Sequence, residues 1–337
     1  MAAWRRVFGY SGLAVLVLVL LAITFTIGWR PVIGPRARSV TDRRFEATPG
    51  RLARGEYLLN SVSACLGCHG DIDWKAPRLV PELLGAGHQF SDEGLDWIVA
   101  PNLTPDRETG VGAWTDDELA RAIREGIGRD GRALFPMMPY ESFRVMSDED
   151  LASVIVYLRT LMPVRRVLPM TEMPFPLNRF VNTVPTPITE PVPQPDLASP
   201  VNRGRYLVAI AACADCHTPR DQQGQVLAGL EFSGGSVFDN PLGRIAASNI
   251  TPDPSGIPYY TEDLFVDAMR KGMVVARPLH PQMPWLLYRN MTDEDLRGIF
   301  AFLKTLTPAK HRVDNSKPPT DCPLCGQKHG AGDENVR

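Results

Sequence analysis

The chain has 337 residues, of which 44% are hydrophobic, and its 36 basic and 38 acidic residues leave a formal net charge of -2. This balance excludes the strongly basic surface that binds nucleic acid, so no nucleic-acid partner is expected. The hydrophobic content is ordinary for a globular protein, and the length is sufficient for two domains of usual size.

An uncharged segment lies near the N-terminus. Residues 12–29 carry no charged side chain, and the stretch between Arg6 and Arg30 is long enough to span a bilayer as one helix. We therefore predict that residues 1–30 form a single-pass membrane anchor and that residues 31–50 form a tether. The alternative is a cleaved signal peptide, whose apolar region would be shorter and would end in a cleavage site of small residues.

Residues 51–163 are predicted to form the first domain, which contains the pattern C-x-x-C-H at Cys65, Cys68 and His69. This pattern is the attachment signature of haem c. The two thiols bond covalently to the porphyrin edge, and the adjacent histidine ligates the iron from one face. A single copy could also be a redox or zinc motif that happens to precede a histidine, but the chain contains the pattern twice.

Helical signals recur through this domain. Residues 115–118 (Thr-Asp-Asp-Glu) predict a capping box at the start of one helix. Residues 147–150 (Ser-Asp-Glu-Asp) predict the start of another, with acidic side chains in its first turn. The apolar residues that follow recur at helical spacing and form one stripe. No alternating strand pattern competes, so the predicted fold class is mostly α.

Residues 164–200 form a proline-rich linker, which includes Pro191, Pro193 and Pro195. Because proline lacks the backbone N–H and clashes with the preceding helical turn, this segment is not expected to be a helix and favours extended chain. We expect it to lie over or between the domains. A solvated spacer is the alternative.

Residues 201–307 repeat the organisation of the first domain. A second C-x-x-C-H pattern occurs at Cys213, Cys216 and His217, 148 residues after the first. The segments Asn-x-Thr-Pro-Asp, Met-Pro-aromatic and Met-(Ser/Thr)-Asp-Glu-Asp-Leu also occur once in each domain. We therefore predict a tandem duplication of one domain with two covalently bound haem c groups. The Asn-x-Thr-Pro-Asp segments fit either haem-propionate contacts or turns.

Residues 308–337 are predicted to be a polar tail. This tail contains Cys322 and Cys325, but glycine rather than histidine follows the second cysteine, so a third haem motif is excluded. An exposed disulfide is one interpretation, since cysteine pairs are oxidised outside the cytoplasm. A metal site that includes His329 is another, although three ligands leave a structural zinc site incomplete.

The second iron ligand of each haem must come from a residue far along each domain, and repeat symmetry sorts the candidates. Met138 and Met283 match, and each is held by a following proline in a loop; His/Met coordination is a standard arrangement. Met146 and Met291 also match, but each precedes a helix N-cap, where we expect a hydrophobic staple. The remaining candidates are histidines without a counterpart in the other domain, His88 and His280. We predict Met138 and Met283 as iron ligands opposite the motif histidines.

In this order the motifs resemble those of class I cytochrome c domains in the multihaem cytochrome subunits of bacterial membrane-bound dehydrogenases, such as those for alcohols and gluconate. The resemblance covers residues 51–307. It implies that Met138 and Met283 are the distal iron ligands. It also implies redox protein partners: a dehydrogenase subunit as electron donor, and a quinone-linked complex or another cytochrome as acceptor. The chain differs in having two haem motifs where those subunits usually have three, and in its N-terminal span.

The expected function is electron transfer in a respiratory or dehydrogenase-linked chain, without catalysis by this chain itself. A dihaem redox enzyme such as a cytochrome c peroxidase is the alternative, but it needs an open iron position. A haem-based sensor would need an output domain. Although the arginines after the span favour a cytoplasmic body, haem attachment in bacterial c-type cytochromes occurs outside the cytoplasmic membrane. We therefore expect an inner-membrane protein whose haem domains face the periplasm.

Overall fold

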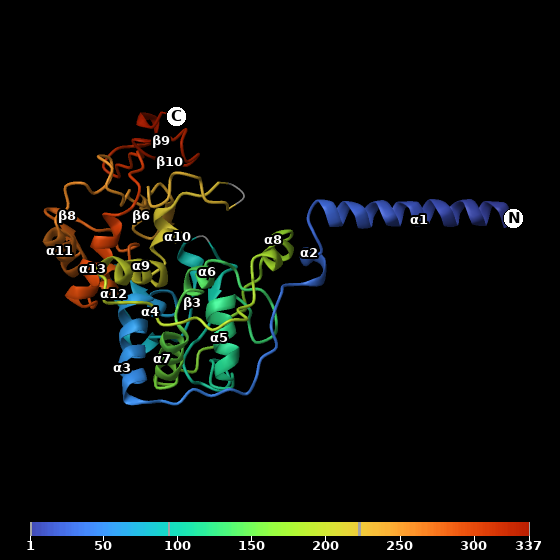
Figure 1. Ribbon diagram of the computed structural model, residues 1–337, viewed down its shortest axis with the longest axis horizontal. Helices are drawn as coiled ribbons and strands as arrows, with labels where there is room; N and C mark the ends of the chain where they lie inside the picture. The colour runs from blue at the N-terminus through green and yellow to red at the C-terminus, as the bar shows by residue number, and fades with distance from the viewer. Residues whose placement is uncertain (1, 94, 222–223, 337) are drawn as a thin grey trace.

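The computed structural model describes residues 2–93, 95–221 and 224–336, and within helix α1 it describes the side chains of Tyr10 and of residues 13–25. The described chain consists mainly of helices and loops, as predicted, and its strands form small two-stranded antiparallel sheets. Figure 1 shows one long helix at the N-terminus that extends away from a body of short helices.

The first helices are α1 (Ala2–Phe25), α2 (Arg30–Ile33), α3 (Pro49–Tyr57), α4 (Cys65–Cys68), α5 (Asp116–Glu125), α6 (Tyr140–Phe143) and α7 (Asp148–Leu158). The later helices are α8 (Leu177–Phe180), α9 (Pro200–Ile210), α10 (Cys213–His217), α11 (Glu262–Lys271), α12 (Trp285–Tyr288) and α13 (Asp293–Leu303). Further single turns are the π-helical η1 (Leu58–Val62) and the 3-10 segments η2 (Pro81–Leu83), η3 (Phe90–Glu93), η4 (Val181–Thr183) and η5 (Gly332–Glu334).

The strands pair as local hairpins: β1 (Ile72–Asp73) with β2 (Arg78–Leu79), β3 (His88–Gln89) with β4 (Val99–Ala100), β5 (Val237–Asn240) with β6 (Gly243–Ala246), β7 (Met273–Val274) with β8 (Arg277–Pro278), and β9 (Pro319–Asp321) with β10 (Lys328–Gly330). Below, the first half denotes the chain from α3 to α7, and the second half denotes the chain from α9 to α13.

Helix α1 makes up most of the predicted membrane anchor. Its described apolar side chains are exposed, for example Leu13 at 58% and Leu18 at 65%. Among the residues that the structure describes, no helix is long and apolar enough to cross a membrane. The predicted span also includes residues 7–9, 11 and 12, whose side chains lie outside the described set.

The predicted tether packs against α5 in the first half. Arg38 forms ion pairs with Asp117 at 2.8 Å and with Glu125 at 2.7 Å. The backbone N–H of Phe45 donates a hydrogen bond of 2.8 Å to the carboxylate of Asp116. These contacts hold residues 38–45 on the body.

The proline-rich linker also lies against the first half, as expected, rather than forming a solvated spacer. The backbone N–H of Asp148 donates to the carbonyl of Val192 at 2.9 Å. The hydroxyl of Ser147 donates to Gln194 at 2.6 Å. The linker therefore runs across the N-terminus of α7, which the sequence alone did not specify.

Local capping explains where the main helices begin. Thr115 and Glu118 form the predicted capping box at the start of α5. The hydroxyl of Ser147 accepts from the Asp150 N–H at the start of α7, and that of Thr292 accepts from the Asp295 N–H at the start of α13. Both caps satisfy backbone donors that the helix itself leaves unpaired.

In each half, the first helix crosses the last helix at close range. A Cβ atom on Gly55 of α3 would lie 2.0 Å from the carbonyl oxygen of Ser153 in α7. A Cβ atom on Gly204 of α9 would lie 1.8 Å from the carbonyl oxygen of Gly298 in α13. Both glycines allow backbone contact that any side chain would prevent.

The two halves exchange matched hydrogen bonds across their interface. In one direction, Tyr206 of α9 donates to Asp150 at 2.8 Å and accepts from the Ser147 N–H at 3.1 Å. In the other, Tyr57 of α3 donates to Asp295 at 2.5 Å and accepts from the Thr292 N–H at 3.1 Å. Each tyrosine thus docks on the capped N-terminus of the last helix in the opposite half.

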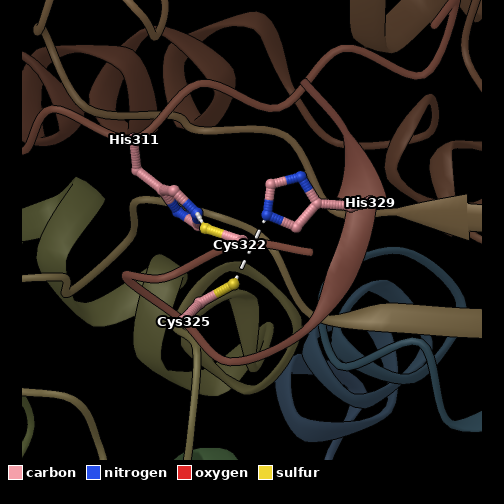
Figure 2. A group of neighbouring side chains, drawn as sticks. All are labelled: His311, Cys322, Cys325 and His329. Atoms are coloured by element: carbon pink, nitrogen blue, oxygen red, sulfur yellow. Dashed lines mark hydrogen bonds between the residues drawn. The ribbon is translucent and has the colours of Figure 1, made fainter. Parts of the chain in front are cut away.

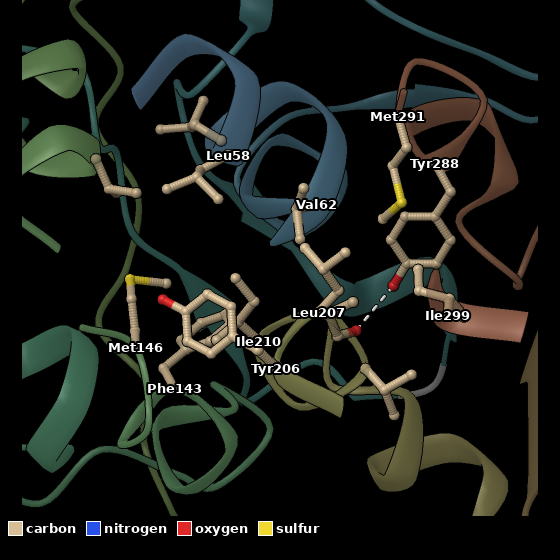
Figure 3. Packing of buried hydrophobic residues seen from close by; sticks show 14 of the residues in the cluster. Leu58, Val62, Phe143, Met146, Tyr206, Leu207, Ile210, Tyr288, Met291 and Ile299 are labelled. Atoms are coloured by element: carbon tan, nitrogen blue, oxygen red, sulfur yellow. Dashed lines mark hydrogen bonds between the residues drawn. The ribbon is translucent and has the colours of Figure 1, made fainter. Parts of the chain in front are cut away.

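One hydrophobic core joins the halves. Figure 3 shows buried side chains from both halves in the same cluster: Leu58, Val62, Phe143, Met146, Tyr206, Leu207, Ile210, Tyr288, Met291 and Ile299. Met146 and Met291 are only 1% and 2% exposed, which agrees with the predicted staples at the starts of α7 and α13. The halves therefore share apolar burial as well as hydrogen bonds.

Candidate functional site

The two C-x-x-C-H patterns occupy matched positions in the fold, on α4 and α10. Each is preceded by an alanine with positive φ, Ala64 at 49° and Ala212 at 54°. This left-handed conformation is unfavourable for a residue with a side chain. Its presence at both positions shows that the same turn presents both motifs.

Both motif histidines are oriented by a backbone carbonyl. The Nδ1 atom of His69 hydrogen-bonds to the carbonyl of Pro101 at 2.8 Å, and that of His217 to the carbonyl of Ser248 at 2.7 Å. A carbonyl can only accept, so Nδ1 carries the proton and Nε2 keeps a free lone pair, as in metal-ligating histidines. Burial lowers the pKa of both imidazoles, which favours the neutral form that binds metal.

The motif cysteines lie in surroundings that disfavour charge. Burial raises the pKa of the thiols of Cys65, Cys213 and Cys216 to about 12. A thioether has no ionisable proton, so these surroundings suit covalent attachment better than a reactive thiolate. The charge of Cys68 in the first half also raises the pKa of Cys216, so the two thiols lie near one another.

Contacts between the halves place each motif against the opposite half. Asp215, inside the second motif, accepts a hydrogen bond of 3.1 Å from the hydroxyl of Ser142 in α6. A Cβ atom on Gly67, inside the first motif, would lie 3.1 Å from Leu287 in α12. The two motifs therefore meet at the junction of the halves.

A single cavity of about 3170 Å³ contains all the residues predicted to bind haem or iron. These lining residues are Cys65, Cys68, His69, Met138, Cys213, Cys216, His217 and Met283. Small-molecule pockets are typically ~300–1,000 Å³, so this cavity has room for more than one large group. Its thiol, imidazole and thioether groups fit haem c.

The loops that carry Met138 and Met283 are held by aromatic side chains. A Cβ atom on Gly126 would lie 2.6 Å from the ring of Tyr140, and one on Gly272 would lie 2.6 Å from the ring of Trp285. Both glycines have positive φ and end the preceding helices α5 and α11. An aromatic residue two positions after each methionine, Tyr140 or Trp285, thus fills the space over a matched glycine.

The other ligand candidates have different surroundings. His88 pairs with Asp71 at 2.7 Å and is not among the lining residues of the cavity. His280 lines the cavity, and its Nδ1 atom accepts from the Gln282 N–H at 3.1 Å. Met146 and Met291 also line the cavity, but they are packed in the core. Iron coordination by Met138 and Met283 stays a prediction.

The hydrogen bonds of the Asn-x-Thr-Pro-Asp segments favour the interpretation as turns. The side-chain oxygen of Asn102 accepts from the Thr104 N–H at 2.9 Å, and that of Asn249 accepts from the Thr251 N–H at 2.9 Å. Each asparagine amide also donates at 2.8 Å to a carbonyl just after the last helix, that of Val164 or Ala309. These asparagines hold loops together.

The segment predicted to be a polar tail contains a group of buried residues that the sequence alone did not reveal. Cys322 and Cys325, interpreted from the sequence as an exposed disulfide or as part of an incomplete metal site, are buried and form no disulfide. They lie with His329 and His311. The C-x-x-C-x-x-x-H spacing was visible, but His311 precedes it without any recognisable motif.

Comparison with known proteins identifies the family. The model of cytochrome C oxidase, cbb3-type, subunit III matches residues 50–158. The diheme cytochrome c-type protein of Cereibacter sphaeroides is 31% identical over 274 residues, which cover 77% of this chain and 87% of that protein. The fructose dehydrogenase cytochrome subunit of Gluconobacter japonicus is 29% identical over 276 residues, covering 77% of this chain and 53% of the relative.

A longer relative matches a similar share of the chain. A nicotinate dehydrogenase subunit of Pseudomonas putida is 32% identical over 277 residues, covering 76% of this chain but only 21% of that protein. The chain thus spans about half or less of the length of these dehydrogenase relatives. Most of these relatives are named as cytochromes or cytochrome subunits, which confirms the prediction of an electron carrier rather than a catalytic subunit. The chain belongs to the family of c-type cytochromes that includes the diheme cytochrome c-type protein and the cytochrome c subunits of dehydrogenases.

Proposed function

We propose that this chain is a membrane-anchored dihaem c-type cytochrome that passes electrons from a dehydrogenase subunit to a further redox partner in the bacterial periplasm. One observation carries the proposal. Two C-x-x-C-H motifs, each with a histidine whose Nε2 is free, share one cavity with a matched pair of methionines.

The residues divide the work between attachment and electron transfer. Cys65, Cys68, Cys213 and Cys216 would hold the two groups covalently, so the cofactors cannot dissociate. Haem c bound there supplies iron that changes its oxidation state by one electron. Met138 and Met283 would each fill the last iron position of one haem, opposite its motif histidine, and leave none for substrate. An iron with both axial positions filled favours an electron carrier over a peroxidase.

The partner assignment draws on the relatives. Their names attach them to fructose, gluconate and alcohol dehydrogenases as cytochrome subunits. We propose that a dehydrogenase subunit is the donor here and that a quinone-linked complex or another cytochrome is the acceptor. Because the chain covers only part of those relatives, the substrate of the dehydrogenase is not assigned.

The proposed location draws on the N-terminal segment. Residues 12–29 carry no charge, and Figure 1 shows α1 standing clear of the body. Exposed leucine and valine side chains along α1 would be stable in lipid, where apolar surface has no contact with water. We propose that α1 anchors the chain in the inner membrane with the haem domains in the periplasm.

Haem stoichiometry tests the central proposal. Thioether bonds survive unfolding, so the denatured chain is expected to retain two haems, measured by intact mass and by a pyridine haemochrome assay. Replacing Cys65 and Cys68 by Ala, or Cys213 and Cys216 by Ala, is expected to remove one haem each. A wild-type chain with one haem, or a pair of substitutions without effect, would contradict the proposal.

A further inference from the structure

Four buried side chains in the C-terminal segment converge on one point. They are His311, Cys322, Cys325 and His329. Each offers one ligand atom, and these four atoms all lie within 4.8 Å of one another. Figure 2 shows the two rings and the two sulfur atoms directed toward each other. None of the four is among the lining residues of the large cavity, so the group is separate from the haem motifs.

The distances between ligand atoms fit a tetrahedral metal ion. The sulfur of Cys322 lies 3.4 Å from Nε2 of His311, and the sulfur of Cys325 lies 3.3 Å from Nε2 of His329. A zinc ion with Zn–S of ~2.3 Å and Zn–N of ~2.0–2.1 Å separates neighbouring sulfur and nitrogen ligands by about 3.5 Å. The side chains are therefore already spaced for coordination.

Hydrogen bonds to backbone carbonyls orient the imidazole rings of His311 and His329 for metal binding. Nδ1 of His311 hydrogen-bonds to the carbonyl of Ser233 at 3.2 Å, and Nδ1 of His329 hydrogen-bonds to the carbonyl of Gly330 at 3.1 Å. These carbonyls require the proton on Nδ1, so both Nε2 lone pairs face the sulfur atoms. Backbone carbonyls orient metal-ligating histidines in the same way.

We propose that His311, Cys322, Cys325 and His329 bind one structural zinc ion. On binding, each thiol releases its proton to water, and the two thiolates balance the two positive charges of Zn²⁺ while both imidazoles stay neutral. A tetrahedral S₂N₂ set is typical of zinc. A two-iron cluster with His₂Cys₂ ligation separates the histidines from the cysteines on different irons, whereas here each sulfur lies beside an imidazole.

The proposed zinc ion would connect the C-terminal hairpin β9–β10 to His311, on which the loop after the second haem motif packs. Gly235 passes directly over His311: a Cβ atom there would lie 2.4 Å from the imidazole. The N–H of neighbouring Gly234 donates to the carbonyl of His217 at 2.7 Å. The metal would thus support the segment that carries a predicted iron ligand.

An ion pair between Arg166, just after the first half, and Asp71 occupies the equivalent place. The N–H of Arg166 donates to Thr109 at 3.0 Å, as that of His311 donates to Ser255 at 3.0 Å. The Arg166 side chain then pairs with Asp71 at 3.1 Å and donates to the carbonyl of Gly87. In both cases the segment after the last helix is linked to the loop that follows the C-x-x-C-H motif. The link is an ion pair in the first case and the proposed zinc site in the second.

Metal analysis of the full-length protein tests the proposal. Purified from cells supplied with zinc, the chain is expected to contain one zinc in addition to its haem iron. X-ray absorption at the zinc edge, which haem iron does not obscure, is expected to give two sulfur ligands at ~2.3 Å and two nitrogen ligands at ~2.0–2.1 Å. Chelation should release this zinc, and zinc alone should restore it.

Single substitutions provide the matched comparison. The variants His311→Gln and Cys322→Ser are expected to lose most of the zinc while keeping covalent haem. The control is Lys328→Ala, because Lys328 is exposed and adjacent to His329; this variant is expected to keep both zinc and haem. The proposal is overturned if the wild-type protein contains no zinc or another metal at this site. It is equally overturned if Cys322 and Cys325 form a disulfide, seen as an intact mass lower by two hydrogens with no thiol to alkylate. If a variant loses haem, its zinc content no longer decides the question. The release and restoration of zinc in the unsubstituted chain is then the deciding measurement.

Discussion

Repeat symmetry favours Met138 and Met283 over the other methionines and the spare histidines as iron ligands, and the surroundings of these two methionines in the fold are equally matched. Each lies two residues before an aromatic ring that packs on a glycine with positive φ. Such a fixed loop would hold a flexible thioether in one place, which is what an axial ligand requires.

Replacing either methionine by Ala is expected to remove the sulfur-to-iron charge-transfer band of one haem and to admit carbon monoxide. The potential of that haem should fall by on the order of 0.1 V, within the ~0.8 V range that axial ligands control. Optical redox titration measures both effects. Met146→Ala and Met291→Ala serve as controls that leave the spectrum unchanged and cost about 2–5 kcal/mol of stability. Unaltered spectra for Met138→Ala and Met283→Ala would exclude methionine ligation.

Tyr57 and Tyr206 connect the halves through buried carboxylates. Burial, with the hydrogen bond to Asp295, raises the pKa of Tyr57 to about 12. Burial also raises the pKa of Tyr206, with the charge of Asp150 adding to the effect. Each aspartate additionally pairs with an arginine of its own half, Asp150 with Arg54 and Asp295 with Arg203. The tyrosines are donors only while they are protonated.

The pH dependence of stability follows from this requirement. An unfolded tyrosine ionises near pH 10, whereas Tyr57 in the folded chain holds its proton to about pH 12. Its stabilisation is therefore complete below about pH 10 and is lost as the pH rises toward 12. Tyr57→Phe should cost about 1.5–3 kcal/mol near neutral pH and should make the loss at high pH less steep. Denaturant unfolding of both proteins across this range measures the effect. Parallel curves would show that Tyr57 does not contribute.

At the scale of single residues, the sequence predicted those features of the site that depend on residues adjacent in the chain. The C-x-x-C-H motifs are short, so their chemistry is visible without a fold. His311 and Cys322 lie 11 residues apart and meet His329 only through the hairpin β9–β10. Repeat symmetry gave no help either, because Arg166, just after the first half, occupies the place that corresponds to His311. Such a group becomes visible only in three dimensions.

Among the helices, the crossings of α3 with α7 and of α9 with α13 define each half. The capped starts of α7 and α13 were predictable because an N-cap and its acidic first turn are local. The crossings were not predictable, since a glycine within a helix has the same appearance in a sequence whether it faces water or another backbone. The hairpins β1–β2 and β7–β8 were also missed, because strands of two residues give no alternating pattern.

Adding one methyl group at a crossing tests its importance. Gly55→Ala and Gly204→Ala place a Cβ atom against a backbone carbonyl, and we expect each to cost at least about 1–3 kcal/mol as the helices separate. Gly50→Ala, in the same helix α3 with no atom within 4 Å of its Cβ position, should be neutral or stabilising by about 0.5–1 kcal/mol. Thermal unfolding of the three variants measures these changes in stability. Equal stability of Gly55→Ala and Gly50→Ala would rule out close contact.

For the whole molecule, the sequence predicted the order of segments but not their docking. Both the proposed tether and the proline-rich linker lie on the first half, held by Arg38 and by Gln194. Partners of this kind are separated by many residues, and no local pattern identifies them. The body is thus fixed close to the end of α1 rather than suspended on a free chain.

Deleting residues 1–30 tests the proposed anchor. With a cleavable signal supplied in its place, we expect the shortened chain to be a soluble periplasmic protein with both haems, while the full chain stays in the membrane fraction. Fractionation and N-terminal sequencing measure this. A full chain that is released by a salt wash, with a mature N-terminus near residue 31, would instead indicate a cleaved signal peptide.

The meeting of both motifs at the junction of the halves has a consequence for biogenesis. Gly67 contacts α12 and Asp215 contacts α6, so docking brings both cysteine pairs against the opposite half. The interface contacts also join residues more than 230 positions apart, such as Tyr57 and Asp295, and contacts this distant in sequence form late in folding. Covalent attachment by the maturation machinery is therefore expected to occur on halves that are still separate.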